Sequence, residues 1–111
     1  MINDNNVLPL FAVPLCKTKI EEPSAEIKDY LKNKIQFVRR NYSDADNSLE
    51  LHVLNNPICK PLKDVLVSKM NEFLEYLDVD LEKNQFYMTT SWMNRYSKNQ
   101  WSDLHYHSNS L

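Results

Sequence analysis

The sequence predicts an α+β domain in which two amphipathic helices pack on an antiparallel sheet. Two stripes of apolar residues recur at helical spacing, and several shorter segments alternate or are rich in aromatic and β-branched residues, as strands are. A chain of 111 residues has room for one domain with a modest core. We therefore interpret residues 1–111 as a single domain.

The first helix is predicted over residues 25–40. Residues 21–24 before it supply acidic side chains, a proline and a capping serine, which are typical of a helix start. Four apolar residues follow at spacings of four, four and three, and so share one face: Ile27, Leu31, Ile35 and Val38.

The second helix is predicted to start at residues 55–57, where two asparagines precede a proline, or at Pro61, and to end near Leu77. Its broad apolar face is the clearest core element of the chain. The residues on this face are Leu62, Val65, Leu66, Met70, Phe73, Leu74 and Leu77.

Extended segments account for the rest of the predicted fold. Residues 7–20 are apolar but contain Pro9 and Pro14, which predicts an edge strand or an extended segment lying across another element. The residues expected to be buried in it are Leu10, Phe11, Val13 and Leu15. Strands are predicted over residues 49–54, 86–96 and 104–111. Residues 41–48 are predicted as a polar loop, and residues 97–102 as a hairpin-like turn.

Charge and composition exclude several classes of protein. The net charge is -2 with both signs mixed, so no basic face for nucleic acid is expected. No apolar run approaches the ~20 residues that span a bilayer, and no signal peptide begins the chain, so no membrane association is expected. Cys16 and Cys59 have no metal-like spacing, which predicts two reduced thiols in a cytoplasmic protein.

The chain contains no glycine, although average usage of ~7% would give about eight. Positions with positive φ are therefore expected to hold asparagine or aspartate. This composition, and a sequence that stops in S-N-S-L directly after two histidines, leads us to expect the front part of a larger domain.

The residues with the most suggestive chemistry are His105 and His107. On a strand, side chains two positions apart point to the same face, about 6.5 Å apart for a rise of ~3.3 Å per residue. Two imidazoles so placed form a bidentate site for a metal ion. Asp103 lies about 13 Å from His107 by the same rise, too far to share the ion unless the strand bulges there, so the third ligand is expected to come from elsewhere. The preceding strand becomes polar at Asn94 and Tyr96, as a strand entering a binding cavity would.

Residues 95–107, R-Y-S-K-N-Q-W-S-D-L-H-Y-H, resemble the entry to the double-stranded β-helix, a jelly roll, of Fe(II)/2-oxoglutarate-dependent oxygenases, especially prolyl-hydroxylase-like members. The closing H-Y-H-S-N-S-L and the opening L-P-L-F-A-V-P-L-C-K resemble more closely a group of these oxygenases from phage and bacterial genomes. The resemblance implies that Fe(II) and 2-oxoglutarate are cofactors and that the complete protein hydroxylates a substrate.

The resemblance implies a role for several individual residues of this chain. His105 takes the place of the first metal histidine. His107 stands where the family has an aspartate, so either the site is rich in histidine or His107 is not a ligand. Tyr96 matches a tyrosine that contacts 2-oxoglutarate. Tyr96 and Asn94 together form the expected cofactor-binding pair. Asn99 stands near the usual turn glycine. The family's distal histidine and its cosubstrate arginine lie farther along, so no catalytic residue is assigned and we expect little turnover from these 111 residues.

Two other functions fit the same residues. In a non-catalytic interaction module the histidines would line a cavity or interface, and in a cupin-like protein the H-x-H pair would bind another ion. The substrate, a small molecule or a protein, is not defined by the sequence. An unpaired edge at residues 104–111 would favour a homodimer.

Overall fold

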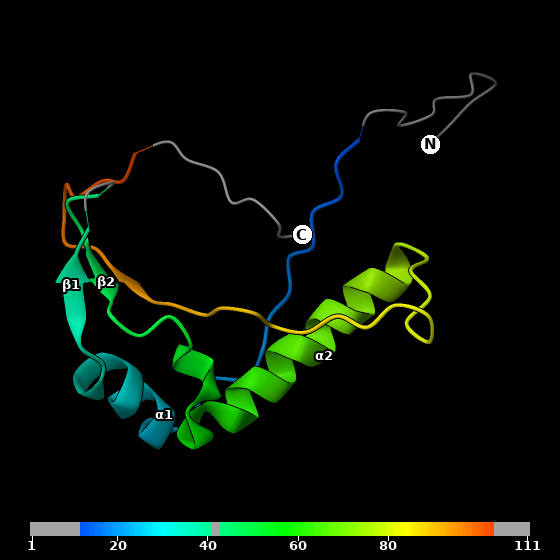
Figure 1. Cartoon of the computed structure of the whole chain (residues 1–111), viewed down its shortest axis with the longest axis horizontal. Coiled ribbons are helices and arrows are strands. Elements are labelled where there is room, and N and C mark those ends of the chain that lie inside the picture. The colour runs from blue at the N-terminus through cyan, green and yellow to red at the C-terminus, as the bar shows by residue number, and fades with distance from the viewer. Residues whose placement is uncertain (1–11, 41–42, 104–111) are drawn as a thin grey trace.

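The computed structural model describes residues 12–40 and 43–103. It confirms the α+β class, with two helical segments and one antiparallel sheet in the order β1-β2-β3 (Figure 1). The elements are α1 (Ala25–Asp29), η1 (Tyr30–Lys34), β1 (Phe37–Arg39), β2 (Asp46–Ser48), η2 (Val53–Asn55), η3 (Pro57–Cys59), α2 (Lys60–Tyr76) and β3 (Asn94–Arg95).

The first helix is shorter than predicted. Ser24 caps it, since its Oγ accepts a hydrogen bond from the N–H of Ile27 at 3.3 Å. The α-helical turn of α1 continues as the π-helical turn η1, and the backbone becomes extended at Ile35. The prediction of helix to residue 40 is wrong because Phe37–Arg39 pairs with β2 instead.

The second helix agrees with the prediction at both ends. Asn56 caps η3 by accepting the N–H of Ile58 at 3.0 Å, and Pro61 lies in the first turn of α2. Beyond α2, Asp78 adopts φ 59°. Its N–H donates to the carbonyl of Glu75, and the N–H of Val79 donates to the carbonyl of Leu74, as in a Schellman motif. The expectation that aspartate replaces glycine at positive φ is confirmed here.

Two of the three strands, β1 and β2, lie in segments for which the sequence patterns did not indicate a strand. The predicted polar loop contains β2, which is the central strand, with Arg39 opposite Asp46 on one side and Arg95 opposite Asp46 on the other. The predicted strand over residues 49–54 is wrong, because η2 occupies its end and only His52 forms a bridge, to Ser91. Of the predicted strand over residues 86–96, only Asn94–Arg95 belongs to the sheet.

The helices lie beside the sheet rather than on one of its faces, which corrects the predicted packing. In Figure 1 the sheet and α2 occupy different ends of the molecule, with residues 84–93 running between them. The main contacts of α2 are with η2 and η3, and α1 also contacts η3. Within the described residues, no helix is both long enough and apolar enough to cross a bilayer.

Burial is sparse, and much of it is polar. The buried apolar residues of the described ranges are Ile27, Ala45, Val53, Cys59 and Leu74; the buried polar ones are Ser43, Asn47 and Ser48. On the predicted apolar face of α2 only Leu74 is buried, and Val65 remains 39% exposed. The α2 face is therefore only partly covered by the described residues.

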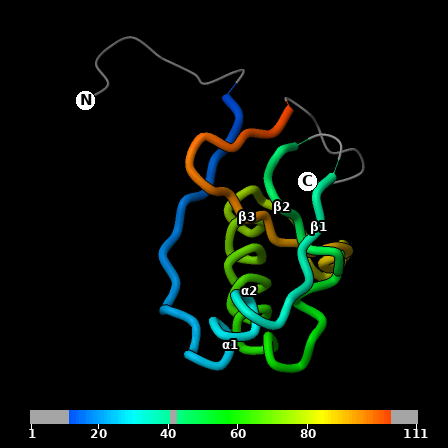
Figure 2. The backbone as a smooth tube through the Cα atoms, turned by 90° about the vertical axis from the view of Figure 1, so that its left-hand side faces the viewer, coloured from blue at the N-terminus to red at the C-terminus, as the bar shows by residue number. Residues whose placement is uncertain are grey.

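Residues 12–20 make no strand pairing within the described chain and run as a separate length of backbone (Figure 2). Val13 and Leu15 are 89% and 92% exposed, so the expectation that they are buried is wrong. Pro14 between them cannot donate a ladder hydrogen bond, which disfavours a paired strand here. Residues 7–11 of the same predicted segment lie outside the described residues.

The cap at the end of α2 predicts that Asp78→Gly stabilises the protein. Glycine adopts positive φ without the steric cost that a Cβ imposes, so the free energy of unfolding should rise by about 0.5 kcal/mol. Urea unfolding followed by circular dichroism measures this. Asn71→Gly within α2 is the matched control and should lower stability by a similar amount. Equal losses in both variants would contradict the cap.

Candidate functional site

The two predicted cofactor-binding residues lie at the edge strand of the sheet. Asn94 belongs to β3 and pairs with Asn47 across the ladder, while Tyr96 follows β3 and is 48% exposed. The Nδ2 of Asn47 donates to the Oδ1 of Asn94 at 2.5 Å. Because this bond occupies the carbonyl side of Asn94, its amide nitrogen can serve as a donor to a ligand. Tyr96 offers a phenolic hydroxyl two residues farther along.

The predicted metal ligands, His105 and His107, lie outside the described residues. The structure therefore does not test their shared direction or the strand predicted over residues 104–111. It does describe the chain that leads to them, as far as residue 103.

A tight turn separates Tyr96 from the approach to the histidines. The N–H of Gln100 donates to the carbonyl of Ser97 at 3.2 Å, and the side chain of Gln100 accepts the N–H of Ser97 at 2.6 Å. Asn99 within this turn has φ 69°. The expectation that positions with positive φ hold asparagine or aspartate is confirmed here too.

This turn does not reverse the chain, so the predicted hairpin-like turn is wrong. Asp46 pairs with Arg95 before the turn, and Ser43 bridges antiparallel to Ser102 after it. From the first pair to the second, one side of the ladder moves by three residues, from Asp46 to Ser43. The other side moves by seven residues, from Arg95 to Ser102. Residues 97–100 are thus looped out of a pairing that continues, and the chain keeps its direction.

A dense set of hydrogen bonds holds the chain beyond the turn. The Asp44 carboxylate accepts the N–H of Trp101 at 2.5 Å, and the N–H of Asp44 donates to the carbonyl of Trp101 at 3.2 Å. The Ser43 hydroxyl donates to the same carbonyl at 2.8 Å, and the Nε2 of Gln100 donates to the carbonyl of Asp44 at 3.0 Å. The backbone at Trp101 is therefore fixed on both its polar groups.

The charged residues of the sheet form a row across all three strands. Asp46 lies between Arg95, whose Nη2 is 2.9 Å from Oδ2, and Arg39, whose Nη2 is 3.4 Å from Oδ1. The guanidinium of Arg95 also lies over the ring of Phe37, 4.1 Å from its centre. The hydrogen bond from Arg95 lowers the pKa of Asp46 below its ordinary value, so this carboxylate stays ionised.

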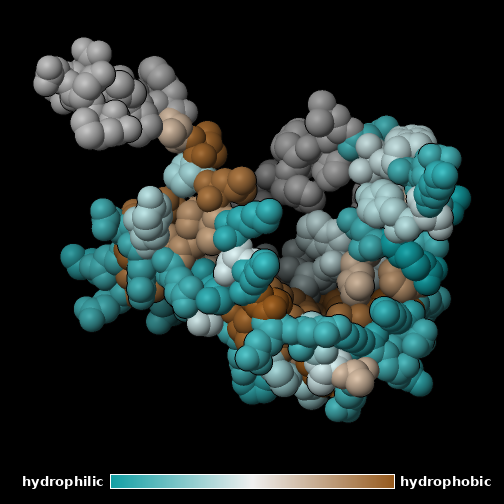
Figure 3. Space-filling model, turned by 180° about the vertical axis from the view of Figure 1, so that it is seen from behind, coloured by the Kyte–Doolittle hydropathy of each residue, from teal (hydrophilic) through white to brown (hydrophobic). Residues whose placement is uncertain are grey.

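An apolar hollow of about 370 Å³ lies between the helices and the chain that leads to β3. Trp92 lines it and is 40% exposed. The other lining residues are Leu31, Val53, Leu54, Leu62, Met88, Thr90, Ser91 and Met93. Figure 3 shows apolar surface gathered at the centre of one face of the molecule.

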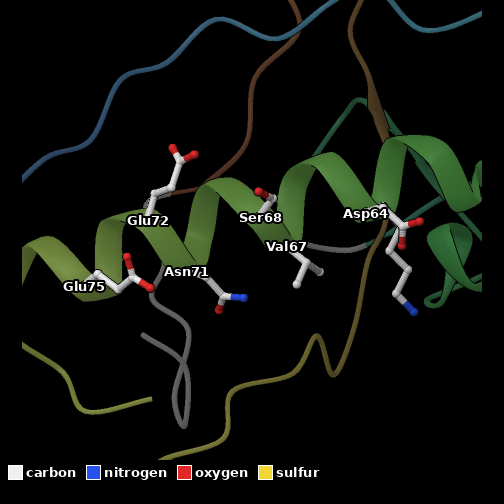
Figure 4. Close-up of a pocket in the computed structure, with 7 residues that line it drawn as sticks. Asp64, Val67, Ser68, Asn71, Glu72 and Glu75 are labelled. Atoms are coloured by element: carbon white, nitrogen blue, oxygen red, sulfur yellow. The ribbon is translucent and has the colours of Figure 1, made fainter. Parts of the chain in front are cut away.

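A second hollow, of about 410 Å³, lies along α2 (Figure 4). All of its described lining residues come from this one helix: Lys63, Asp64, Val67, Ser68, Asn71, Glu72 and Glu75. Side chains from a single helix with mixed charges are typical of a solvated helix face. This hollow does not bring functional groups from different elements together.

Other groups with metal or nucleophile chemistry are dispersed. In residues 12–40 and 43–103, no three His, Cys, Asp or Glu side chains are grouped as a metal site requires. His52 is exposed and borders a hollow of about 520 Å³ with Tyr30 and Glu50. Cys16 and Cys59 are both free thiols. Burial raises the pKa of Cys59, which disfavours its thiolate.

Among the expected cofactors, 2-oxoglutarate is the one for which the described residues offer hydrogen-bond donors. A cosubstrate with carboxylates needs hydrogen-bond donors at an accessible position, and both the Asn94 amide and the Tyr96 hydroxyl supply them. Sequence reasoning missed Asn47 and Asp44, which hold Asn94 and Trp101. Their only sequence signal is that both are polar residues in a segment without apolar periodicity.

Comparison of the chain with protein-family models, with curated proteins and with solved structures finds no match.

The row of charges across the sheet predicts an acid-sensitive contribution to stability. Because the pKa of Asp46 is lowered on folding, its contribution is present above the unfolded value near 3.8 and is lost as pH falls below it. Asp46→Asn should therefore lower the melting temperature by a few degrees at pH 7, and the difference should shrink as pH falls below the unfolded value near 3.8.

Thermal unfolding by circular dichroism from pH 3 to pH 7 measures this difference. Asp29→Asn is the matched control, because Asp29 is bonded to Asn33 rather than to an arginine. A difference between Asp46→Asn and the unmodified protein that stays constant over this range would contradict the role of the arginines.

Proposed function

We propose that this chain is the N-terminal part of a cytoplasmic, jelly-roll Fe(II)/2-oxoglutarate-dependent oxygenase. The observation that carries the proposal is the order of features along residues 94–107. Donors at Asn94 and Tyr96 come first, then the left-handed turn at Asn99, then an extended approach, and then the H-x-H pair. The resemblance to oxygenases rests on this same stretch of sequence.

His105 and His107 would hold the metal through their imidazole nitrogens. Histidine suits Fe(II), and two ligands leave positions open for a cosubstrate and a third protein ligand. When bound, Fe(II) with 2-oxoglutarate supplies the oxygen activation that hydroxylation needs. The chain's own part is to bind and orient these groups. We assign no catalytic residue within residues 1–111.

Replacing a carboxylate by His107 changes the charge of the proposed site. A neutral imidazole leaves the full positive charge of the metal uncompensated by this ligand, whereas aspartate would neutralise part of it. Such a site attracts a dianionic cosubstrate more strongly. The donors at Asn94 and Tyr96 would add directional hydrogen bonds to a carboxylate.

A non-catalytic interaction module is the second candidate, and exposed apolar surface favours it. Val13 and Leu15 are almost fully exposed, and the hollow lined by Trp92 is open and apolar. Contiguous apolar surface is typical of protein–protein contacts, including a homodimer. Absence of metal uptake would support this candidate. Metal binding without 2-oxoglutarate binding would support a cupin-like protein instead.

The metal proposal predicts that both H-x-H histidines are needed for Co(II) binding, with Co(II) as a visible-absorbing substitute for Fe(II). His105→Ala and His107→Ala should each weaken binding at least tenfold, because each removes one of two chelating nitrogens. Titration followed by d–d absorption measures the affinity. His52→Ala is the matched control and should bind as the unmodified protein does. Equal affinity in all four proteins would sink the proposal.

The cosubstrate proposal predicts that Tyr96→Phe weakens 2-oxoglutarate binding. Loss of one hydrogen bond to a charged carboxylate should cost about 1.5 to 3 kcal/mol, or roughly tenfold to a hundredfold in affinity. Calorimetric titration of the Co(II)-loaded protein measures this. Tyr87→Phe is the control, since Tyr87 is 78% exposed and lies before β3. An unchanged affinity in Tyr96→Phe would remove this residue from the site.

A further inference from the structure

The geometry points to the hollow beside η1 as a binding site for a small zwitterion with an apolar side chain, such as a free aliphatic amino acid. This hollow has a volume of about 520 Å³ and is bordered by η1, by the two residues that follow it and by residues 49–52 after β2. In Figure 1 the chain from α1 to β1 and the chain that leaves β2 lie at the same end of the sheet. None of the lining residues belongs to the proposed metal or cosubstrate site, so the inference does not depend on the proposed function.

One wall of the hollow is a π-helical turn. Tyr30 and Lys34 are the first and last residues of η1, and both line the hollow. Side chains four positions apart lie on the same side of a helix. π-helical turns are rare in globular proteins and occur frequently at functional sites. An uncommon backbone conformation therefore brings an aromatic ring and an ammonium group to the same hollow.

The opposite wall carries two exposed leucines on a firmly held backbone. Leu49 is 50% exposed and Leu51 is 44% exposed. The N–H of Leu49 donates to the carbonyl of Gln36 at 2.8 Å, and the carbonyl of Leu51 accepts the N–H of Ser91 at 2.9 Å. Because these bonds fix the backbone, binding here needs little reorganisation, which lowers its entropy cost. Together with Ile35, the leucines give the hollow an apolar wall that the side chain of a small ligand would cover.

Two opposite charges border this apolar wall without neutralising each other. Lys34 and Glu50 both line the hollow, and within the described residues neither forms an ion pair. The Oε1 of Glu50 accepts the N–H of His52 at 2.7 Å, which orients this carboxylate. A ligand with a single charge would meet one of the two groups with the same sign. A zwitterion satisfies both, because its carboxylate pairs with Lys34 and its ammonium group with Glu50.

The size and exposure of the hollow set the class and the affinity of its ligand. Sites for small molecules span about 300 to 1,000 Å³ and combine apolar walls with a few polar groups that fix orientation. An aliphatic amino acid carries a carboxylate, an ammonium group and an apolar side chain in one small molecule. Because most of the lining residues are exposed, we expect a dissociation constant on the order of 1 mM.

The test is a titration of the isotope-labelled 111-residue protein with L-leucine, followed by the amide chemical shifts of residues 34–36 and 49–52. We expect saturable shifts with leucine and none with glycine, which has the same charges but no apolar side chain. N-acetyl-L-leucine lacks the ammonium group and L-leucinamide lacks the carboxylate. Each should bind about threefold to fivefold more weakly than leucine, as expected for the loss of one exposed ion pair.

Two charge-removing variants identify the partner of each ligand group. Glu50→Gln keeps an oxygen that can accept the His52 N–H, and should weaken leucine and leucinamide about threefold to fivefold but not N-acetyl-leucine. Lys34→Gln should weaken leucine and N-acetyl-leucine by a similar factor but not leucinamide. Lys32→Gln is the matched control, because Lys32 lies on the same turn but does not line the hollow. The same spectra show whether each variant keeps the fold.

Several results would overturn the inference. Leucine that produces no saturable shift at these amides, or glycine that binds as tightly, would exclude an amino-acid site. N-acetyl-leucine that binds as tightly as leucine would indicate a site for simple anions. Unchanged leucine affinity in both Lys34→Gln and Glu50→Gln would place the ligand elsewhere. Shifts of the same amides when the protein alone is concentrated would show that a second copy of the chain covers the hollow.

Discussion

The sheet depends on the satisfaction of buried polar groups along its central strand. The Ser48 N–H donates to the carbonyl of Met93, the Met93 N–H donates to the Ser48 Oγ, and the Ser48 hydroxyl donates to the carbonyl of Glu50. Ser48 and Asn47 are almost completely buried. Buried polar groups are costly unless they are bonded. β2 therefore stays in place because β3 and the chain before it supply these partners.

Local signals were sufficient to predict α2. Its apolar period, the Asn56 cap and Pro61 all lie within or next to the helix, and the aspartate at its end replaces a glycine that the chain does not contain. The first helix was predicted too long for the opposite reason. Val38 continues its apolar period, but Phe37–Arg39 forms a ladder with β2, and β2 is itself paired with β3, 47 to 49 positions farther along the chain. Tertiary pairing overrides a weak local preference.

The candidate site likewise contains residues that local signals predicted and residues that they did not. Periodicity and resemblance placed Asn94 and Tyr96 on or beside one strand, and the missing glycine indicated Asn99 for the left-handed turn. Neither could identify Asp44 or Asn47. Asp44 and Trp101 are 57 positions apart, and their hydrogen bond follows from strand register rather than from a motif. A segment of small polar residues gives no apolar period, so its central position in the sheet was not predictable.

Asn47 illustrates the energetic cost of this polar arrangement. Its amide nitrogen is bonded to Asn94, but among the described residues its carbonyl oxygen Oδ1 is buried without a hydrogen-bond partner. Leaving a buried acceptor unpaired costs about 1–3 kcal/mol, and an apolar residue at this position of β2 would avoid that cost. What the asparagine contributes is a hydrogen bond to the Asn94 carbonyl, which leaves the Asn94 amide nitrogen to donate elsewhere. If Asn94 binds the cosubstrate as we propose, this local cost maintains a binding group rather than stability.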